Sequence, residues 1–135
     1  MRKYKFVAVL LCLSFVLTAC GARGASTTIN VTFTDFHFTP ESFTVPAGQE
    51  ITVNAVNNGA VVHNFVIMKY GTTVGDNYGP EDDVNIFWKL ETQPGDNITA
   101  KFTAPTDPGD YQVICVTPGH YQAGMVAKLT VVAGK

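Results

Sequence analysis

Four side chains of this chain have the chemistry to bind a soft metal ion. Three of them follow one another near the C-terminus, in the segment Cys115-Val-Thr-Pro-Gly-His120-Tyr-Gln-Ala-Gly-Met125. The fourth is His63, which stands in the largely apolar run Val61-Val-His-Asn-Phe-Val66. One thiolate, two imidazoles and a thioether form the ligand set of a type 1 (blue) copper site, in which the methionine binds weakly along the axis. The pattern therefore predicts one copper ion held by His63, Cys115, His120 and Met125.

The predicted donor set suits both oxidation states of copper. A thiolate is a strong, soft donor, neutral imidazole binds Cu(I) and Cu(II), and a weak thioether favours neither strongly. Such a site changes its geometry little when an electron moves. Each donor alone has a simpler explanation, because a single buried cysteine or a methionine most often serves packing. Their combination, with a Pro-Gly turn between cysteine and histidine, favours the metal site.

Residues 1–19 are predicted to be a signal peptide. Three basic residues precede an uncharged, mostly apolar run from Phe6 to Ala19, which is long enough for a signal sequence and short for a membrane span. The run ends in Leu17-Thr-Ala-Cys20, which resembles the lipobox of bacterial lipoproteins. We therefore expect cleavage before the cysteine, a lipid on its thiol, a tether over residues 20–28, and an exported protein anchored to the outer face of the cell membrane. An ordinary secreted protein, cleaved a few residues later, is the alternative.

Residues 29–135 are long enough for one domain with a substantial core. Loss of the signal leaves six basic against eleven acidic side chains without a basic patch, which argues against a nucleic-acid partner. Cys12 leaves with the signal and Cys20 would carry the lipid, so Cys115 is the only free thiol expected in the exported domain. An unpaired cysteine in an exported protein indicates metal binding or reactivity, in agreement with the predicted copper site.

The elements that must position the donors are predicted to be strands. Alternating or continuously apolar segments indicate strands over residues 29–38, 43–45, 50–57, 60–69, 98–102, 111–116 and 125–132. About seven to eight short strands at this spacing are typical of an all-β Greek-key sandwich or barrel. One short helix is predicted over Pro80–Leu90, because a proline followed by three acidic residues suits a helix N-terminus.

Strand alternation brings two of the donors together. Cys115 shares one face of its strand with Val113, and His63 shares a face of another strand with Phe65. If both faces point into the sandwich, the thiol and the imidazole meet at one end of it. Pro118-Gly119 would then reverse the chain so that the two remaining donors reach the same point.

The whole pattern resembles the cupredoxin family of blue-copper proteins, the group of azurin and plastocyanin, and within it is similar to the auracyanins. The resemblance covers about residues 28–133 and rests on Val62-His-Asn-Phe65, on Gly109-Asp-Tyr-Gln-Val-Ile-Cys115 and on the Cys-x4-His-x4-Met loop. It implies a cupredoxin-like sandwich, a type 1 copper bound by the same four donors, and redox partner proteins.

The resemblance also implies roles for neighbouring residues. Asn64 would tie the ligand loops together, and its backbone N–H would donate to the thiolate. Many azurin and plastocyanin sequences place Thr or Ser directly after the cysteine as the partner of this asparagine, but Val116 stands there, which makes Thr117 the candidate. Electrons would pass through the exposed edge of His120, with a rim of Pro118, Tyr121 and Ala123.

These features together predict an electron-transfer protein, not an enzyme, that shuttles single electrons between membrane-associated partners. A copper-binding or delivery lipoprotein is the alternative, although no exposed cluster of methionines and histidines, as delivery sites normally use, is visible in the sequence. A cysteine hydrolase would need an acid to orient His120, and the sequence offers none nearby. A zinc site would have little use for a thioether.

Overall fold

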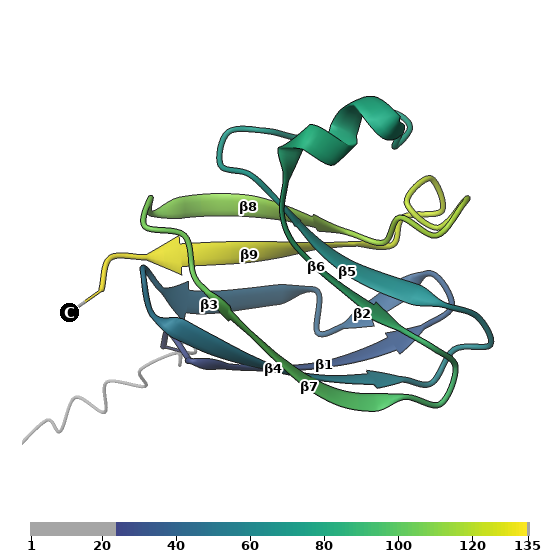
Figure 1. The fold of residues 1–135 in the computed structure, drawn as a ribbon, viewed down its shortest axis with the longest axis horizontal. Helices are drawn as coiled ribbons and strands as arrows, with labels where there is room; N and C mark the ends of the chain where they lie inside the picture. The colour runs from purple at the N-terminus through teal and green to yellow at the C-terminus, as the bar shows by residue number, and fades with distance from the viewer. Residues whose placement is uncertain (1–23, 135) are drawn as a thin grey trace, which may run out of the picture.

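The computed structural model describes residues 24–134, so the predicted signal peptide and residues 20–23 of the predicted tether, with Cys20, lie outside the described residues. The described chain forms two sheets that face each other (Figure 1). One sheet has the order β2-β1-β4-β7, with strands His37–Thr39, Thr28–Thr34, Glu50–Asn57 and Asn97–Thr103. The other has the order β3-β9-β8-β5-β6, with strands Ser42–Pro46, Val126–Val132, Gly109–Ile114, His63–Met68 and Ile86–Thr92. The predicted all-β sandwich is confirmed.

Each sheet contains one parallel pair among antiparallel neighbours. Strand β1 runs parallel to β4, and β3 runs parallel to β9, whereas β5 is antiparallel to both β6 and β8. Strand β3 follows β2 along the chain but belongs to the other sheet, where it pairs with β9. The N-terminal half of the chain therefore contributes to both layers. The chain thus passes from one sheet to the other between β2 and β3.

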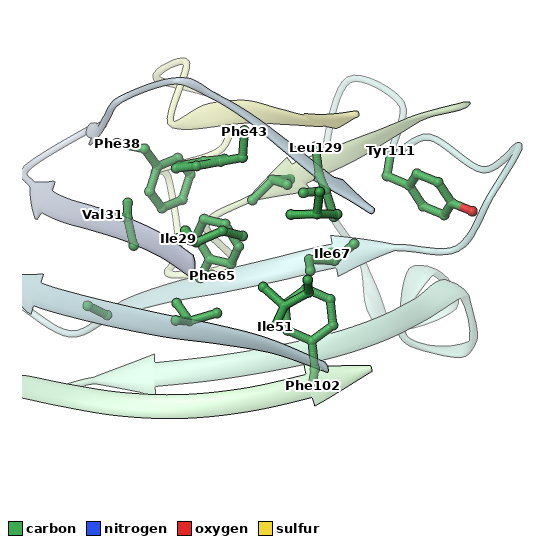
Figure 2. Close-up of a cluster of buried hydrophobic side chains, with 14 of the residues drawn as sticks. Ile29, Val31, Phe38, Phe43, Ile51, Phe65, Ile67, Phe102, Tyr111 and Leu129 are labelled. Atoms are coloured by element: carbon green, nitrogen blue, oxygen red, sulfur yellow. The ribbon is translucent and has the colours of Figure 1, made fainter. Parts of the chain in front are cut away.

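The core lies between the sheets and follows from the alternation of the strands. In β4 every second side chain is buried, from Ile51 to Asn57, and the same alternation runs through β1. Figure 2 shows the aromatic and aliphatic side chains that fill this space, among them Phe38, Phe43 and Phe65. The ring of Phe65 lies 5.6 Å from that of Phe38 and 5.5 Å from that of Phe43, both in edge-to-face geometry. Such pairs stabilise a core beyond the burial of their area.

Strand β5 is buried on both faces, as its continuously apolar sequence predicts. Its inner face belongs to the core between the sheets. On its outer face, Val66 and Met68 form a second cluster with Val74 and Ile114. Residues of the segment 70–86 help to cover this second cluster. Within residues 24–134, no helix is long and apolar enough to cross a membrane.

The predicted helix over residues 80–90 is wrong in its second half. A 3-10 helix covers only Pro80–Asn85, and Ile86–Thr92 is strand β6. Ile86, Trp88 and Leu90 are less exposed than the residues between them, which is the period of a strand, and β6 pairs with β5. The apolar positions 86, 87 and 90 also fit a helical period, so the sequence pattern alone favoured the wrong element.

The strand predicted over residues 29–38 is interrupted. Asp35 and Phe36 form a tight turn between β1 and β2, with Thr34 paired to His37 and Phe36 at a φ of +70°. Both Phe33 and Phe38 are buried, so the hairpin keeps the apolar side chains on the core face. With β2 and β6 added, the described residues contain nine strands in place of the seven to eight predicted.

Candidate metal centre

The structure brings three of the predicted donors into one buried group. His63 begins β5, Cys115 directly follows β8, and His120 lies in the loop between β8 and β9, which Figure 1 shows at one end of the sandwich. The Sγ atom of Cys115 lies 3.9 Å from Nδ1 of His63 and 3.7 Å from Nδ1 of His120. The donor atoms of the three residues all lie within 4.8 Å of one another. They form the one such group of three or more found among the described residues.

Backbone hydrogen bonds within the loop bring His120 and Met125 back to Cys115. The N–H of His120 donates to the carbonyl of Thr117 at 3.0 Å, and the N–H of Met125 donates to that of His120 at 2.9 Å. The N–H of Cys115 donates to the carbonyl of Met125 at 3.2 Å, so the first and last donors of the loop are joined. Gly119 has a φ of +84°, which confirms the turn predicted there.

Met125 is fully buried and belongs to the same core cluster as Cys115. Together with the histidines it completes the arrangement of thiolate, two imidazoles and thioether that is typical of a type 1 copper site. His63, Cys115 and Met125 are inaccessible to solvent, and His120 is 7% exposed. A soft ion such as copper fits this closed group of soft and borderline donors.

Hydrogen bonds around the thiol join the strand that carries His63 to the loop. The backbone N–H of Asn64 points at Sγ of Cys115, at 3.4 Å, and the side-chain amide of Asn64 donates to Oγ1 of Thr117 at 3.1 Å. The hydroxyl of Thr117 donates in turn to the carbonyl of Val62 at 2.7 Å. Thr117 is thus the partner of Asn64, as predicted. Val116 packs against the second cluster, which explains an apolar residue at the position after the cysteine.

The outer nitrogen of His63 has an acidic neighbour that sequence reasoning missed. Nε2 of His63 lies 3.3 Å from Oδ1 of Asp35. Burial lowers the pKa of His63 below its usual value and outweighs the opposing effect of Asp35. A neutral imidazole is the form that binds a metal. The acid was missed because residue 35 was predicted to lie within a strand, where its turn position beside the histidine could not be foreseen.

The imidazole of His120 is covered by an aromatic ring that was also missed. The rings of Phe36 and His120 lie with their centroids 5.0 Å apart. Of the predicted rim, Pro118 and Ala123 are exposed, whereas the Tyr121 hydroxyl turns to the second cluster and donates to the carbonyls of residues 74 and 75 at 3.0 and 2.8 Å. Phe36, 44% exposed, therefore supplies the aromatic part of the surface next to His120.

The third histidine lies outside the group. His37 is largely exposed and approaches Glu41 at 3.8 Å, in keeping with the prediction that it is structural or exposed. Asp35, His63 and Cys115 form an acid–imidazole–thiol series that has the composition of a nucleophilic triad. Both the imidazole and the thiol are inaccessible to solvent in this structure.

Comparison with known proteins identifies the family. The model of copper-binding proteins of the plastocyanin/azurin family matches residues 25–132. The chain therefore belongs to the plastocyanin/azurin family of copper-binding proteins, that is, to the cupredoxins.

Among its relatives, the chain is similar to the auracyanins. It is 32% identical to auracyanin-A of Chloroflexus aurantiacus, over 93% of this chain and 94% of that protein. The crystal structure of dithionite-reduced auracyanin from Roseiflexus castenholzii matches with a TM-score of 0.67 and 35% identity, over 81% of this chain and 99% of that one. The copper-resistant cuproprotein CopI of Rubrivivax gelatinosus is 29% identical, over 82% of this chain and 69% of that protein.

Proposed function

We propose that this protein carries single electrons between redox partner proteins through one type 1 copper ion bound by His63, Cys115, His120 and Met125. The observation that carries the proposal is the convergence of a thiol and two Nδ1 atoms in a group closed to solvent. Membership of the plastocyanin/azurin family and the similarity to auracyanins support it. An inaccessible thiol argues against an enzyme that would use Cys115 as a nucleophile.

The bound ion would supply the one-electron chemistry, and the chain's residues prepare the place for it. The Asn64 N–H directed at the thiol would stabilise thiolate charge, and burial under Phe65 and Val113 keeps water away. The sheet and the bonded loop hold the donors in nearly fixed positions, which limits rearrangement when the charge changes. His120 lies closest to solvent of the four, so its imidazole is the expected route to a partner.

The first experiment is addition of Cu(II) to the purified copper-free protein. We expect an intense blue thiolate-to-copper absorption and its complete loss in Cys115→Ala. His37→Ala is the matched control, because this histidine is exposed and lies outside the donor group, and it should keep the full absorption. A colourless copper-loaded protein, or colour that survives in Cys115→Ala, would refute the assignment of the ligands.

Copper binding or delivery is a second candidate function. The observation in its favour is the similarity to a protein named as a copper-resistant cuproprotein. The closed donor group favours the electron carrier, because delivery requires the ion to leave readily. Voltammetry and a copper-transfer assay separate the two functions. A reversible one-electron response with slow loss of copper to a chelator supports the carrier, and rapid transfer without a reversible response supports delivery.

We further propose that the protein is exported and held by a lipid on Cys20 at the outer face of the cell membrane, near its redox partners. The support is the lipobox-like sequence Leu17-Thr-Ala-Cys20 after an apolar run of signal length. A single lipid gives limited membrane affinity, so further contacts with partners would help to retain the protein. In a bacterium that expresses the full chain, Cys20→Ser should move the blue protein from the membrane fraction to the soluble fraction or block its maturation. An unchanged membrane fraction would refute the lipid anchor.

A further inference from the structure

One carboxylate contacts the outer edge of the buried ligand His63. Oδ1 of Asp35 lies 3.3 Å from Nε2 of His63 and accepts a hydrogen bond from the N–H of Ala60 at 3.1 Å. The His63 side chain is inaccessible, whereas that of Asp35 is 45% exposed. Asp35 therefore stands at the boundary between the donor group and solvent, in contact with the nitrogen that does not face Cys115.

The loop between β4 and β5, residues 58–62, is shaped around this contact. A Cβ atom at Gly59 would lie 2.3 Å from Nε2 of His63 and 2.7 Å from Oδ1 of Asp35, so only glycine leaves room there. The loop is fixed by the buried side chain of Asn57, which accepts from the N–H of Gly59 at 2.9 Å. The same side chain donates to the carbonyl of Val61 at 2.9 Å. The backbone thus closes over the imidazole–carboxylate pair.

The turn that supplies the carboxylate reaches both imidazoles of the donor group. Asp35 contacts His63, and the next residue, Phe36, places its ring against His120. Phe36 adopts a φ of +70°, which is costly for a residue with a bulky side chain. The hairpin between β1 and β2 therefore holds a strained turn at the point where it meets the two ligands.

We propose that Asp35 is a positioning residue of the copper site and that its charge lowers the reduction potential; the inference rests on the proposed electron-transfer function. The carboxylate accepts the Nε2–H of His63, which selects the tautomer whose Nδ1 is free to bind the ion. It also fixes the plane of the ring. Its negative charge lies close to the site and stabilises the more positive, oxidised state of the ion.

The alternative is that Asp35 serves only the turn, by accepting the N–H of Ala60. Two substitutions separate the roles. Asp35→Asn removes the charge and keeps an acceptor oxygen, whereas Asp35→Ala removes both. Asp107→Asn is the charge control, because Asp107 is also an exposed aspartate in a loop and lies beyond the opposite end of β8 from Cys115.

The first measurement is the reduction potential of the copper-loaded full-length protein at one fixed pH. Asp35→Asn should raise the potential, so that at a constant applied potential the ratio of oxidised to reduced protein falls about three- to tenfold, the size of a partly screened charge interaction. Asp107→Asn should leave the ratio nearly unchanged. An unchanged ratio in Asp35→Asn, or an equal shift in both variants, would overturn the electrostatic role.

The second measurement needs no metal. Nitrogen-15 NMR of the copper-free protein should show His63 with its proton on Nε2 in the native chain and in Asp35→Asn, and a mixture of tautomers in Asp35→Ala. A single Nε2–H tautomer in Asp35→Ala would overturn the positioning role. If that variant does not fold, Asp35→Ser, with a shorter side chain that withdraws the acceptor from Nε2, gives the same test. A colourless native protein with the expected tautomers would refute the copper function and leave the contact with Asp35 intact.

Discussion

The two histidines of the site are held in different ways. His63 begins a strand that is buried on both faces, and both of its ring nitrogens face protein groups, with Cys115 on one side and Asp35 on the other. His120 lies in a loop held by short-range backbone hydrogen bonds, under the ring of Phe36 and next to exposed residues. One ligand is part of the sheet, and the other lies in a loop, as the ligand nearest to solvent.

This difference assigns separate tasks to the two sides of the site. The strand side provides a fixed reference, because His63 is paired with Thr92 in the sheet and packs against the ring of Phe33 in the core. The loop side, which is the segment between β8 and β9, brings His120 near solvent, where a partner protein can approach. Thr117 joins the sides through its hydrogen bonds with Asn64 and Val62. Rigidity and access are therefore combined by placing them on different elements.

The largest expected effect comes from removing each imidazole in turn. His63→Gly and His120→Gly should both lose the blue absorption of the copper-loaded protein. Added imidazole should restore it in His120→Gly, where the vacated space lies next to solvent, and not in His63→Gly, where the space is enclosed. Absorption spectra recorded during an imidazole titration make the comparison. Equal recovery in both variants would show that the two sides do not differ in access.

The sequence predicts the strand side and the ligands better than the turns around them. The donors were found because their residue types and the Pro-Gly turn specify a rare combination, and alternation placed His63 and Cys115 on inward faces. Asp35 and Phe36 were missed, because residues 29–38 were interpreted as one strand although the apolar alternation changes phase between Phe33 and Phe36. That change of phase marks the turn that keeps both Phe33 and Phe38 buried. The phase change does not reveal that Asp35 and Phe36 meet the two histidines, because those contacts depend on tertiary packing.

A smaller effect is expected from cutting the connection between the two sides. Thr117→Val keeps the side-chain volume but removes the hydrogen bond to the Val62 carbonyl and the acceptor of the Asn64 amide. Because Oδ1 of Asn64 already lacks a partner, the variant leaves this buried amide with no partner at all. We expect a loss of about 1–3 kcal/mol in the free energy of unfolding of the copper-free protein, measured with urea.

The matched control is Thr99→Val, which removes one hydrogen bond, to Asn54, on the exposed face of β7. It should change the free energy of unfolding by no more than about 0.5 kcal/mol. If the two variants lose the same stability, Thr117 does not connect the strand and the loop in the way the geometry indicates. A full loss of colour in Thr117→Val would show that the connection also determines the ligand positions.

The smallest effect concerns the segment of residues 70–86, to which the loop between β8 and β9 is hydrogen-bonded through Tyr121. Tyr121 bonds to this segment, and Tyr78 lies within it, hydrogen-bonded to Asp83. Burial, followed by the hydrogen bond and charge of Asp83, raises the pKa of Tyr78 to about 12. Since the folded state favours the protonated phenol, this contribution to stability is complete below the unfolded value near 10 and is lost as the pH rises through 12.

Ultraviolet titration of phenolate in the native protein and in Tyr78→Phe measures this effect. The difference between the two curves should have its midpoint near pH 12. A second variant, Asp83→Asn, keeps an acceptor and removes the charge, so the midpoint should move toward 10 while burial retains part of the shift. A midpoint near 10 in the native protein would mean that the segment leaves Tyr78 in solvent. The loop side would then receive less support from this segment, and His120 would depend more on its backbone hydrogen bonds, on Phe36 and on the hydrogen bonds of Thr117.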